Sequence, residues 1–313
     1  MQRASIAACF VSLLALSLRP VKDSSWLIMT LLVTPAKSLQ PMHLLKITAG
    51  SFLICLLTAC STSPTGRSQF LIVSPDSAIQ QSRGAYRQAV ETIREEDKLS
   101  ENRVLDARIR RIAGRVVTAA VGDYPRSATW EWSVVVVEED ETVNAWCMAG
   151  GRMAVYTGLF EQLKLTDAEF AQIIGHEISH ALANHTAERM SRAMAIQLGL
   201  IAISAATDGS QSAGQGAELL AQMALELPNS RTAETEADRL GMRLATLAGY
   251  DPEAAVTLWQ KMSELGEEQP PAFLSTHPAP NDRQAQLNAL IPTMRSLNPT
   301  GSKLPATNVR IVN

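Results

Sequence analysis

The sequence predicts a mainly helical α+β protein with one small β-sheet. Helix start signals followed by apolar residues at helical spacing recur through most of the chain beyond its N-terminal region. One stretch, residues 130–156, is instead rich in β-branched and aromatic residues and is divided by Gly150-Gly151, as in a hairpin. We therefore expect one main domain, residues 69–297, followed by a mobile tail, residues 298–313, which lacks helical periodicity.

The expected elements follow one another in a simple order. Ser74-Pro75-Asp76 opens the first helix with a cap, a proline at the first position and an early acid. Thr166 opens a later helix, and Glu169 three positions on completes a capping box. The sheet lies between these helices as a strand and a hairpin. The expected helices are residues 74–96, 102–121, 194–206, 251–265 and 281–297 and those that open at Thr166 and Ser230; the expected strands are 130–137, 143–148 and 152–156.

The helix that opens at Thr166 contains the most specific motif of the chain. His176 and His180 are four positions apart, so they share one face of the helix and can hold one metal ion. Glu177 follows the first histidine and can take a proton from a metal-bound water, which zinc makes acidic. The motif predicts a zinc site with Glu177 as the catalytic base, which is the chemistry of peptide-bond hydrolysis.

A catalytic zinc keeps three protein ligands, so a third must come from another segment. On the helix that opens at Ser230, Glu234 and Asp238 are four apart and share one face with the small residues Ala237 and Gly241. That face can approach the first helix closely. We expect Glu234 to be the third ligand and Asp238 to orient a ligand imidazole through its free ring N–H.

Two nearby titratable residues are not expected at the metal. His185 is five positions past His180, about 140° further round a continuous helix, so it cannot join the same site and is interpreted as structural. Glu236 points away from the face of Glu234. We expect it to be a solvated carboxylate that pairs with Arg239 or Arg243.

These motifs resemble those of the membrane-associated zinc peptidases that include HtpX, the CAAX prenyl proteases, BepA and LoiP. Members carry HExxH, then Glu-x-x-x-Asp on a later helix, here Glu234 and Asp238. Ahead of the metal helix they carry Asn-Ala-x-x-x-x-Gly-Gly, here Asn144 to Gly151. The resemblance covers roughly residues 66–287. It implies a zincin-like metallopeptidase domain of the gluzincin type with one catalytic zinc.

The Asn144 segment also has a physical role of its own in the expected hairpin. An edge strand that borders the active site can pair main chain to main chain with an extended peptide and lay the scissile carbonyl over the metal. We therefore assign substrate binding to Asn144, Ala145, Trp146 and Cys147. The alternative is a protected edge strand that binds no peptide.

His277 lies in Ser275-Thr276-His277-Pro278, which matches a Thr-His-Pro…Arg segment of the resembling proteins. Two active-site roles are open: a hydrogen-bond donor to the oxyanion of the tetrahedral intermediate, or a removable fourth ligand that caps the zinc. A loop histidine positioned by Pro278 is the plain alternative. Loss of activity in His277→Ala would favour the first role, and a gain would favour the second.

The N-terminal region predicts a lipid anchor at Cys60. An apolar run ends in Leu57-Thr58-Ala59-Cys60, which looks like a bacterial lipoprotein processing site. We expect residues 42–59 to be the signal peptide, Cys60 to carry the lipid and residues 60–68 to be a short tether. Because Ser61 follows the cysteine, the chain resembles lipoproteins of the outer membrane. The expected location is the bacterial cell envelope, at the periplasmic face of that membrane.

Residues 1–41 do not fit a signal peptide. They hold two further apolar runs, and neither is long enough to span a bilayer. Met42, with His43 and Lys46, directly precedes the apolar core of the expected signal. We hypothesise that residues 1–41 are a misassigned extension; a membrane-embedded leader is the alternative.

Charge and cysteine content narrow the partners. The formal net charge is −3, and the part beyond residue 59 is more acidic still, so nucleic acid is not an expected partner. Of the 4 cysteines, Cys9 and Cys55 precede the processing site and Cys60 is acylated, so Cys147 remains alone and no internal disulfide is expected. The expected partners are unfolded or extended proteins, and the membrane through Cys60.

The sequence thus predicts a lipid-anchored zinc endopeptidase that acts on misfolded or immature cell-envelope proteins. A different class is a non-proteolytic chaperone or assembly factor, in which the same groove binds an extended protein and the metal site is latent. A structural lipoprotein with a chance motif is the third alternative.

Overall fold

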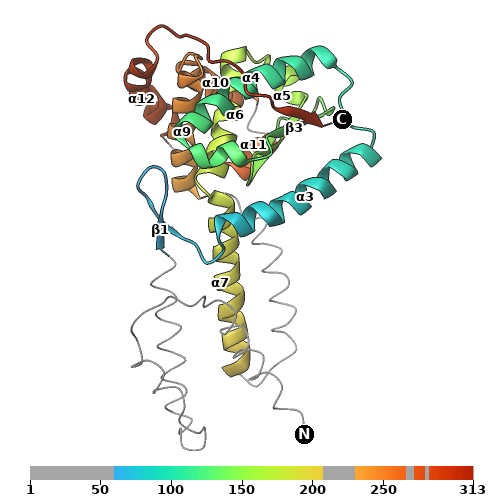
Figure 1. The fold of residues 1–313 in the computed structure, drawn as a ribbon, viewed down its shortest axis with the longest axis vertical. Helices are drawn as coiled ribbons and strands as arrows, with labels where there is room; N and C mark the ends of the chain where they lie inside the picture. Colours follow the sequence, from blue (N-terminus) through green and yellow to red (C-terminus); the bar gives the residue numbers. More distant parts are fainter. Residues whose placement is uncertain (1–59, 207–229, 266–270, 279–281, 313) are drawn as a thin grey trace, which may run out of the picture. The chain divides into compact units, whose positions relative to one another are not determined.

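The computed structural model describes residues 60–206, 230–265, 271–278 and 282–312 (Figure 1). The expected extension and signal peptide, residues 1–59, lie outside this part. Helices predominate around one small sheet, which confirms the mainly helical α+β class. The helices are α3 (Pro75–Glu95), α4 (Arg103–Asp123), η2 (Pro125–Thr129), α5 (Gly158–Leu163), α6 (Asp167–Leu182), α7 (His185–Ala206), α9 (Arg231–Leu247), α10 (Ala254–Glu264), α11 (Ala272–Thr276) and α12 (Arg283–Leu297).

The main sheet contains the predicted hairpin. Strands β4 (Ala145–Met148) and β5 (Arg152–Tyr156) pair antiparallel, and Gly150 and Gly151 between them take φ of 89° and 82°, values that favour glycine. Strand β3 (Ser133–Val137) then lies parallel to β5. The order of the described strands is β4-β5-β3-β6, which leaves β4 at an edge.

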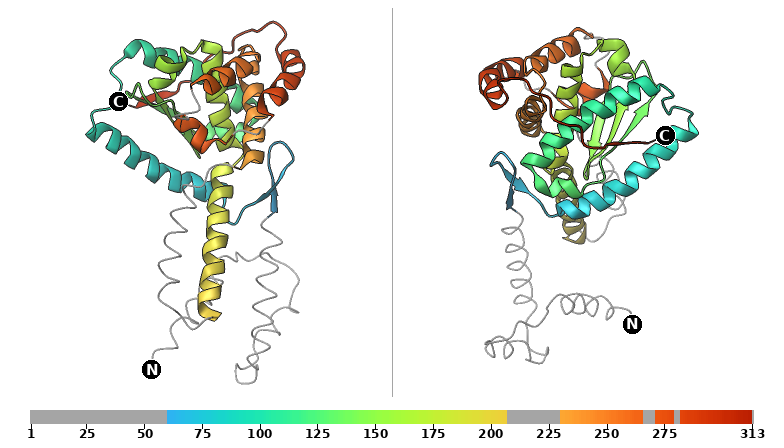
Figure 2. Two further views of the ribbon diagram at one scale, coloured as in Figure 1. Left: turned by 180° about the vertical axis from the view of Figure 1, so that it is seen from behind. Right: turned by 45° about the horizontal axis from the view of Figure 1, so that its top comes forward.

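Alternation along the strands divides the core into two layers. Val134 and Val136 of β3 pack with residues of α4 and α6 on one face. Val135 and Val137 pack with the buried side of α3 on the other face. Figure 2 shows the strands between α3 and α4. The sheet therefore presents one end of β4 to α6, the helix that carries the metal motif.

The expectation of a mobile tail is wrong. Strand β6 (Arg310–Val312) pairs parallel with β3 at the second edge of the sheet, and Val309 is fully buried. Thr307 donates a backbone hydrogen bond to the Gly114 carbonyl on α4, and a side chain at Gly114 would collide with the Thr307 carbonyl oxygen. The tail lacks helical periodicity because it is extended.

Residues 60–68, expected to be a short tether, contain regular structure. Strands β1 (Cys60–Thr62) and β2 (Ser68–Phe70) form an antiparallel hairpin. Arg67, in this hairpin, binds Glu188 of α7 and Glu236 of α9. We call residues 60–70 the N-terminal hairpin.

Helix α7 begins earlier than expected, at His185, and leads away from the sheet in Figure 1. Met194, Ile196 and Leu198 on it are about 40% exposed, so this apolar segment is not a core helix over these residues. Within the described ranges, no helix is both long and apolar enough to cross a membrane.

Candidate metal centre

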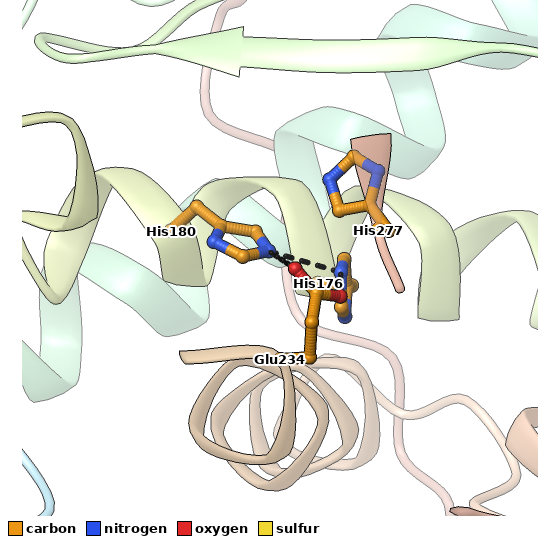
Figure 3. A group of neighbouring side chains, drawn as sticks. All are labelled: His176, His180, Glu234 and His277. Carbon is orange, nitrogen blue, oxygen red and sulfur yellow. Dashed lines mark hydrogen bonds and ion pairs between the residues drawn. The ribbon is translucent and has the colours of Figure 1, made fainter. Parts of the chain in front are cut away.

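Helix α6 brings the two predicted zinc ligands together. A capping box holds its start: the Thr166 hydroxyl accepts a hydrogen bond from the Glu169 backbone N–H, and the Glu169 carboxylate accepts one from the Thr166 N–H. Further along the helix, the Nε2 atoms of His176 and His180 lie 3.0 Å apart, and both rings are buried. Figure 3 shows the two imidazoles meeting at one point, which Glu234 approaches from α9.

Helix α9 supplies the carboxylate. Glu234 is fully buried, with Oε2 3.3 Å from His176 Nε2 and Oε1 3.5 Å from His180 Nε2. The two helices cross at glycines. A Cβ on Gly175 would lie 2.5 Å from the Gly241 carbonyl oxygen, and a Cβ on Gly241 would lie 2.5 Å from the backbone nitrogen of His176. The backbones are thus in direct contact, and this places Glu234 where the predicted third ligand must lie.

His277 reaches the same point from the end of α11. His176, His180, Glu234 and His277 each offer one ligand atom, and these four atoms all lie within 4.8 Å of one another. His277 Nδ1 lies 3.0 Å from the Phe273 carbonyl oxygen, which can only accept. Nδ1 therefore carries the proton, and Nε2 faces the cluster with its lone pair. Burial lowers the pKa of His277 to about 4, and the ring stacks on Phe273 at 4.3 Å between centroids.

The donor set fits a zinc ion. Neither oxygen of Glu234 accepts a hydrogen bond from any residue that the structure describes, although the side chain is wholly buried. The Arg283 guanidinium, which binds Asp238, stays 3.6 Å from Glu234 Oε2. A buried carboxylate without donors is costly unless a cation compensates it. Two imidazoles and one carboxylate form a three-ligand set that zinc takes in catalytic sites, with a further position left for water, substrate or a fourth ligand. The cluster can therefore hold zinc.

The electrostatics of the two histidines favour the same ion. Burial and the charge of neighbouring His176 lower the pKa of His180 well below its usual value, which keeps His180 neutral as a metal ligand must be. At His176, burial acts in the same direction, but the nearby carboxylates of Asp238 and Glu234 outweigh it and raise the pKa to about 9. The carboxylates thus favour a positive charge at this point, and a divalent cation supplies one.

Glu177 lies beside the cluster. Its Oε2 accepts a hydrogen bond from the Cys147 backbone N–H at 3.2 Å, and its Oε1 lies 3.3 Å from His277 Nε2. Burial raises the pKa of Glu177 to about 8. A carboxyl group with this pKa exchanges its proton near neutral pH, as a general base requires.

Asp238 holds His176 from behind. Its Oδ1 lies 2.9 Å from His176 Nδ1, so the Nε2 lone pair of that ring is directed at the cluster. Arg283 grips both oxygens of Asp238, at 2.7 and 2.6 Å, and its guanidinium lies 3.3 Å over the Trp259 ring. The sequence indicated Asp238, but it did not reveal a partner for Arg283 or a role for Trp259.

His185 lies outside the metal cluster, as predicted, but the geometric reason given for it was wrong, and the interpretation of Glu236 needs correction. Helix α6 ends at Leu182, Asn184 takes a left-handed φ of 57°, and a new helix starts at His185, so the angle for a continuous helix does not apply. His185 Nδ1 lies 2.8 Å from His180 Nδ1. Glu236 is 5% exposed rather than solvated, and it pairs with His185 and Arg67 rather than with the arginines on its own helix.

Of the predicted substrate-binding residues, Ala145, Trp146 and Cys147 lie on the edge strand β4, and Asn144 directly precedes it. Ala145 is buried in the core, whereas Trp146 and Cys147 line a pocket of about 490 Å³ between β4, α3 and α7. Arg189 of α7 forms part of its wall. Burial raises the pKa of the Cys147 thiol well above its usual value, so this side chain acts as a small apolar group. Cys147 thus lines the pocket and also binds Glu177 through its backbone N–H.

A helix that carries HExxH, crossed by a helix that carries a buried glutamate, defines a zincin-like metallopeptidase domain of the gluzincin type. The comparison with protein families agrees with this class. Residues 102–291 match the model of Peptidase family M48, and the chain belongs to this family. The resemblance noted in the sequence is thereby confirmed.

The chain is also similar to individual proteases. It is 30% identical over 262 residues to metalloendopeptidase OMA1, mitochondrial, of Bos taurus, which covers 80% of this chain and 49% of the relative. It is 38% identical over 165 residues to mitochondrial metalloendopeptidase OMA1 of Arabidopsis thaliana, covering 51% and 32%. It is 28% identical over 153 residues to beta-barrel assembly-enhancing protease of Yersinia pestis, covering 46% and 31%. The matched part spans half or less of the length of each relative.

Proposed function

We propose that this protein is a zinc-dependent endopeptidase whose metal ligands are His176, His180 and Glu234. The observation that carries the proposal is the wholly buried, donor-free carboxylate of Glu234 facing two imidazole Nε2 atoms. Zinc bound there would polarise the scissile carbonyl and acidify a water molecule. The relatives named as metalloendopeptidases support the same activity.

Glu177 is the catalytic base in this proposal. The Cys147 N–H holds its Oε2 and thereby fixes the carboxylate, while Oε1 accepts no hydrogen bond within the described part of the chain. Oε1 takes a proton from the attacking water and later delivers it to the leaving amine. Loss of a general base typically costs about 10²- to 10⁴-fold in rate.

The substrate is an extended segment of an unfolded, misfolded or immature protein. Strand β4 has a free edge among the described strands, and a peptide added to it would run beside Glu177. The pocket lined by Trp146, Cys147 and Arg189 would take one of its side chains. The Ala145 main chain would supply further pairing along the same strand, whereas the Asn144 carbonyl already accepts a hydrogen bond from the Tyr156 N–H of β5.

Purified full-length protein in detergent tests the activity with casein as substrate. Zinc-loaded wild type is expected to cleave casein, whereas Glu177→Gln and a chelated sample are expected to be at least about 10²-fold slower. Equal cleavage by wild type and Glu177→Gln would reject Glu177 as the base. Zinc measured by elemental analysis in Glu177→Gln controls for loss of the metal.

His277 caps the metal in this proposal rather than donating to the oxyanion. Its Nδ1 proton is engaged by the Phe273 carbonyl, so Nε2 offers a lone pair, which suits a metal and not an oxyanion. His277→Ala should therefore raise casein cleavage. A fall in kcat with KM unchanged would return His277 to the donor role.

A latent site is the second candidate function, because His277 Nε2 already lies with the three other ligand atoms. A protein with the metal capped in this way would bind extended chains as a chaperone or assembly factor. A strain that carries Glu177→Gln separates the two: retention of the wild-type phenotype would favour assembly, and loss would favour proteolysis.

We also propose that Cys60 is acylated and anchors the protein in the bacterial cell envelope, at the periplasmic face of the outer membrane. The processing-site sequence at residues 57–60 supports this. An alkyne-labelled fatty acid should be incorporated into wild type and not into Cys60→Ser. Equal labelling of the two would reject the anchor.

A further inference from the structure

The two histidine ligands are supported from behind in different ways. His176 leans on the carboxylate of Asp238, a common arrangement for a metal-binding imidazole. His180 has no carboxylate behind it among the described residues, and its Nδ1 instead meets Nδ1 of His185 at 2.8 Å. A nitrogen–nitrogen hydrogen bond requires a proton on one atom and a lone pair on the other.

Glu236 decides which atom has the proton. His185 Nε2 lies 3.2 Å from Glu236 Oε2, and an ionised carboxylate only accepts hydrogen bonds. His185 therefore carries a proton on Nε2, and its Nδ1 serves as the acceptor in the contact with His180. His180 must then donate from Nδ1, which leaves the lone pair of His180 on Nε2, the atom that faces the metal cluster. The contact selects the tautomer of His180 that can bind zinc.

The N-terminal hairpin holds Glu236 in place. Arg67 Nε donates to Glu236 Oε2 at 2.8 Å, and Thr65 Oγ1 donates to Glu236 Oε1 at 2.7 Å. The other end of the Arg67 guanidinium binds both oxygens of Glu188, at 3.0 and 2.7 Å. Because a guanidinium and a hydroxyl both donate to it, the Glu236 carboxylate is held in its ionised, accepting form.

We propose that the N-terminal hairpin positions the zinc ligand His180 through Arg67, Glu236 and His185. The proposal rests on the zinc site proposed above and adds that its affinity for zinc depends on residues just beyond Cys60. Loss of a residue that hydrogen-bonds a metal ligand typically weakens metal binding by about 10- to 100-fold. Arg67, Glu236 and His185 are positioning residues in this scheme, since none of them contacts the metal.

Zinc affinity of the full-length protein in detergent, measured by chelator competition, tests the proposal. His185→Ala and Arg67→Met should bind zinc about 10- to 100-fold more weakly than wild type. His185→Asn should recover part of the loss, because its amide oxygen can accept the His180 Nδ1 proton although it does not reach Glu236. The matched control is Arg243→Met. Arg243 is on α9, like Glu236, but it pairs with Asp123 of α4 and takes no part in the contacts behind His180.

Two further readouts separate positioning from general stability. A merely structural role would lower the melting temperature of the apo and zinc-loaded forms alike, whereas the proposal predicts a smaller gap between the two forms. The visible spectrum of the Co²⁺-substituted protein should change in His185→Ala and not in Arg243→Met. Wild-type zinc affinity in both Arg67→Met and His185→Ala would overturn the proposal, whereas failure of wild type itself to bind zinc would overturn the proposed function.

Discussion

The supports of His176 and His180 differ in where they end. Behind His176, Asp238 and Arg283 form a closed unit: Asp238 and Arg283 are both nearly buried, and the guanidinium is covered by Trp259. Behind His180, the chain of contacts runs outward through His185 and Glu236 to Arg67, whose side chain is 20% exposed. One ligand is thus fixed by the core of the domain, and the other by a surface hairpin. The difference teaches that the loss of the residues behind one ligand can destabilise the protein more than the loss of those behind the other.

The core support should be the most costly to break. Asp238→Ala leaves Arg283 buried without its main carboxylate partner, and removal of one member of a buried pair costs about 3–5 kcal/mol in the free energy of unfolding. Urea unfolding of wild type and variant measures the loss. Asp238→Asn, which keeps an acceptor for His176, is the matched control and should lose less. If Asp238→Ala lost less free energy of unfolding than Arg67→Met, the contrast between the two supports would be wrong.

Removal of the metal should have the next largest effect. A ligand that binds only the native state stabilises it by about 2.7 kcal/mol when its free concentration is 100 times the dissociation constant. Chelation of zinc-loaded protein should therefore lower the melting temperature, and less so in His185→Ala, where zinc is bound more weakly. Identical melting curves for chelated and zinc-loaded wild type would show that the native state binds no zinc.

The helix crossing affects both ligands together. In Gly241→Ala the new methyl group would lie 2.5 Å from the backbone nitrogen of His176, so α6 and α9 must move apart. This should lower the free energy of unfolding by about 1–3 kcal/mol. Gly84→Ala on α3 is the control, because no atom lies within 4 Å of its added Cβ and the change should stabilise the helix. Thermal unfolding compares the two variants. Equal stability of both would mean that the crossing can relax.

The cap of α6 should have the smallest effect. Thr166→Ala removes the side-chain acceptor for the Glu169 N–H and costs about 1 kcal/mol, whereas Thr166→Ser keeps the hydroxyl. The cap belongs to neither support, so zinc affinity of the folded protein should be unchanged. A weaker zinc affinity in Thr166→Ala alone would show that the helix start also positions the ligands.

Local patterns allowed much of the metal helix to be predicted. Helix geometry fixes the relation of His176 to His180, and the capping box fixes where the helix begins. The same logic placed Glu234 and Asp238 on one face of α9. The hairpin of β4 and β5 followed from its glycine pair.

Contacts between distant segments could not be predicted in this way. The parallel pairing of β3 with β6 joins residues far apart in sequence, and a three-residue strand has no period to detect. The contact of His185 with His180 was missed for a local reason: one residue in the left-handed region, Asn184, follows the end of the helix on which the angle was calculated. The partners of Glu236 were predicted from its own helix alone, whereas Arg67, which binds it, lies 169 positions earlier in the sequence.

The crossing of α6 and α9 also bears on the size of the ion that the site accepts. Because Gly175 and Gly241 bring main chain against main chain, the separation of the α6 and α9 backbones is set by their contact, and only the ligand side chains can adjust to an ion. The two helices leave little room for contraction, so a small ion must be met by the reach of Glu234. A larger ion such as Cd²⁺ would displace the loop of His277 instead, since that ligand is carried by the five-residue helix α11 and not by the crossing. Discrimination among metals by radius would then lie on the His277 side of the centre.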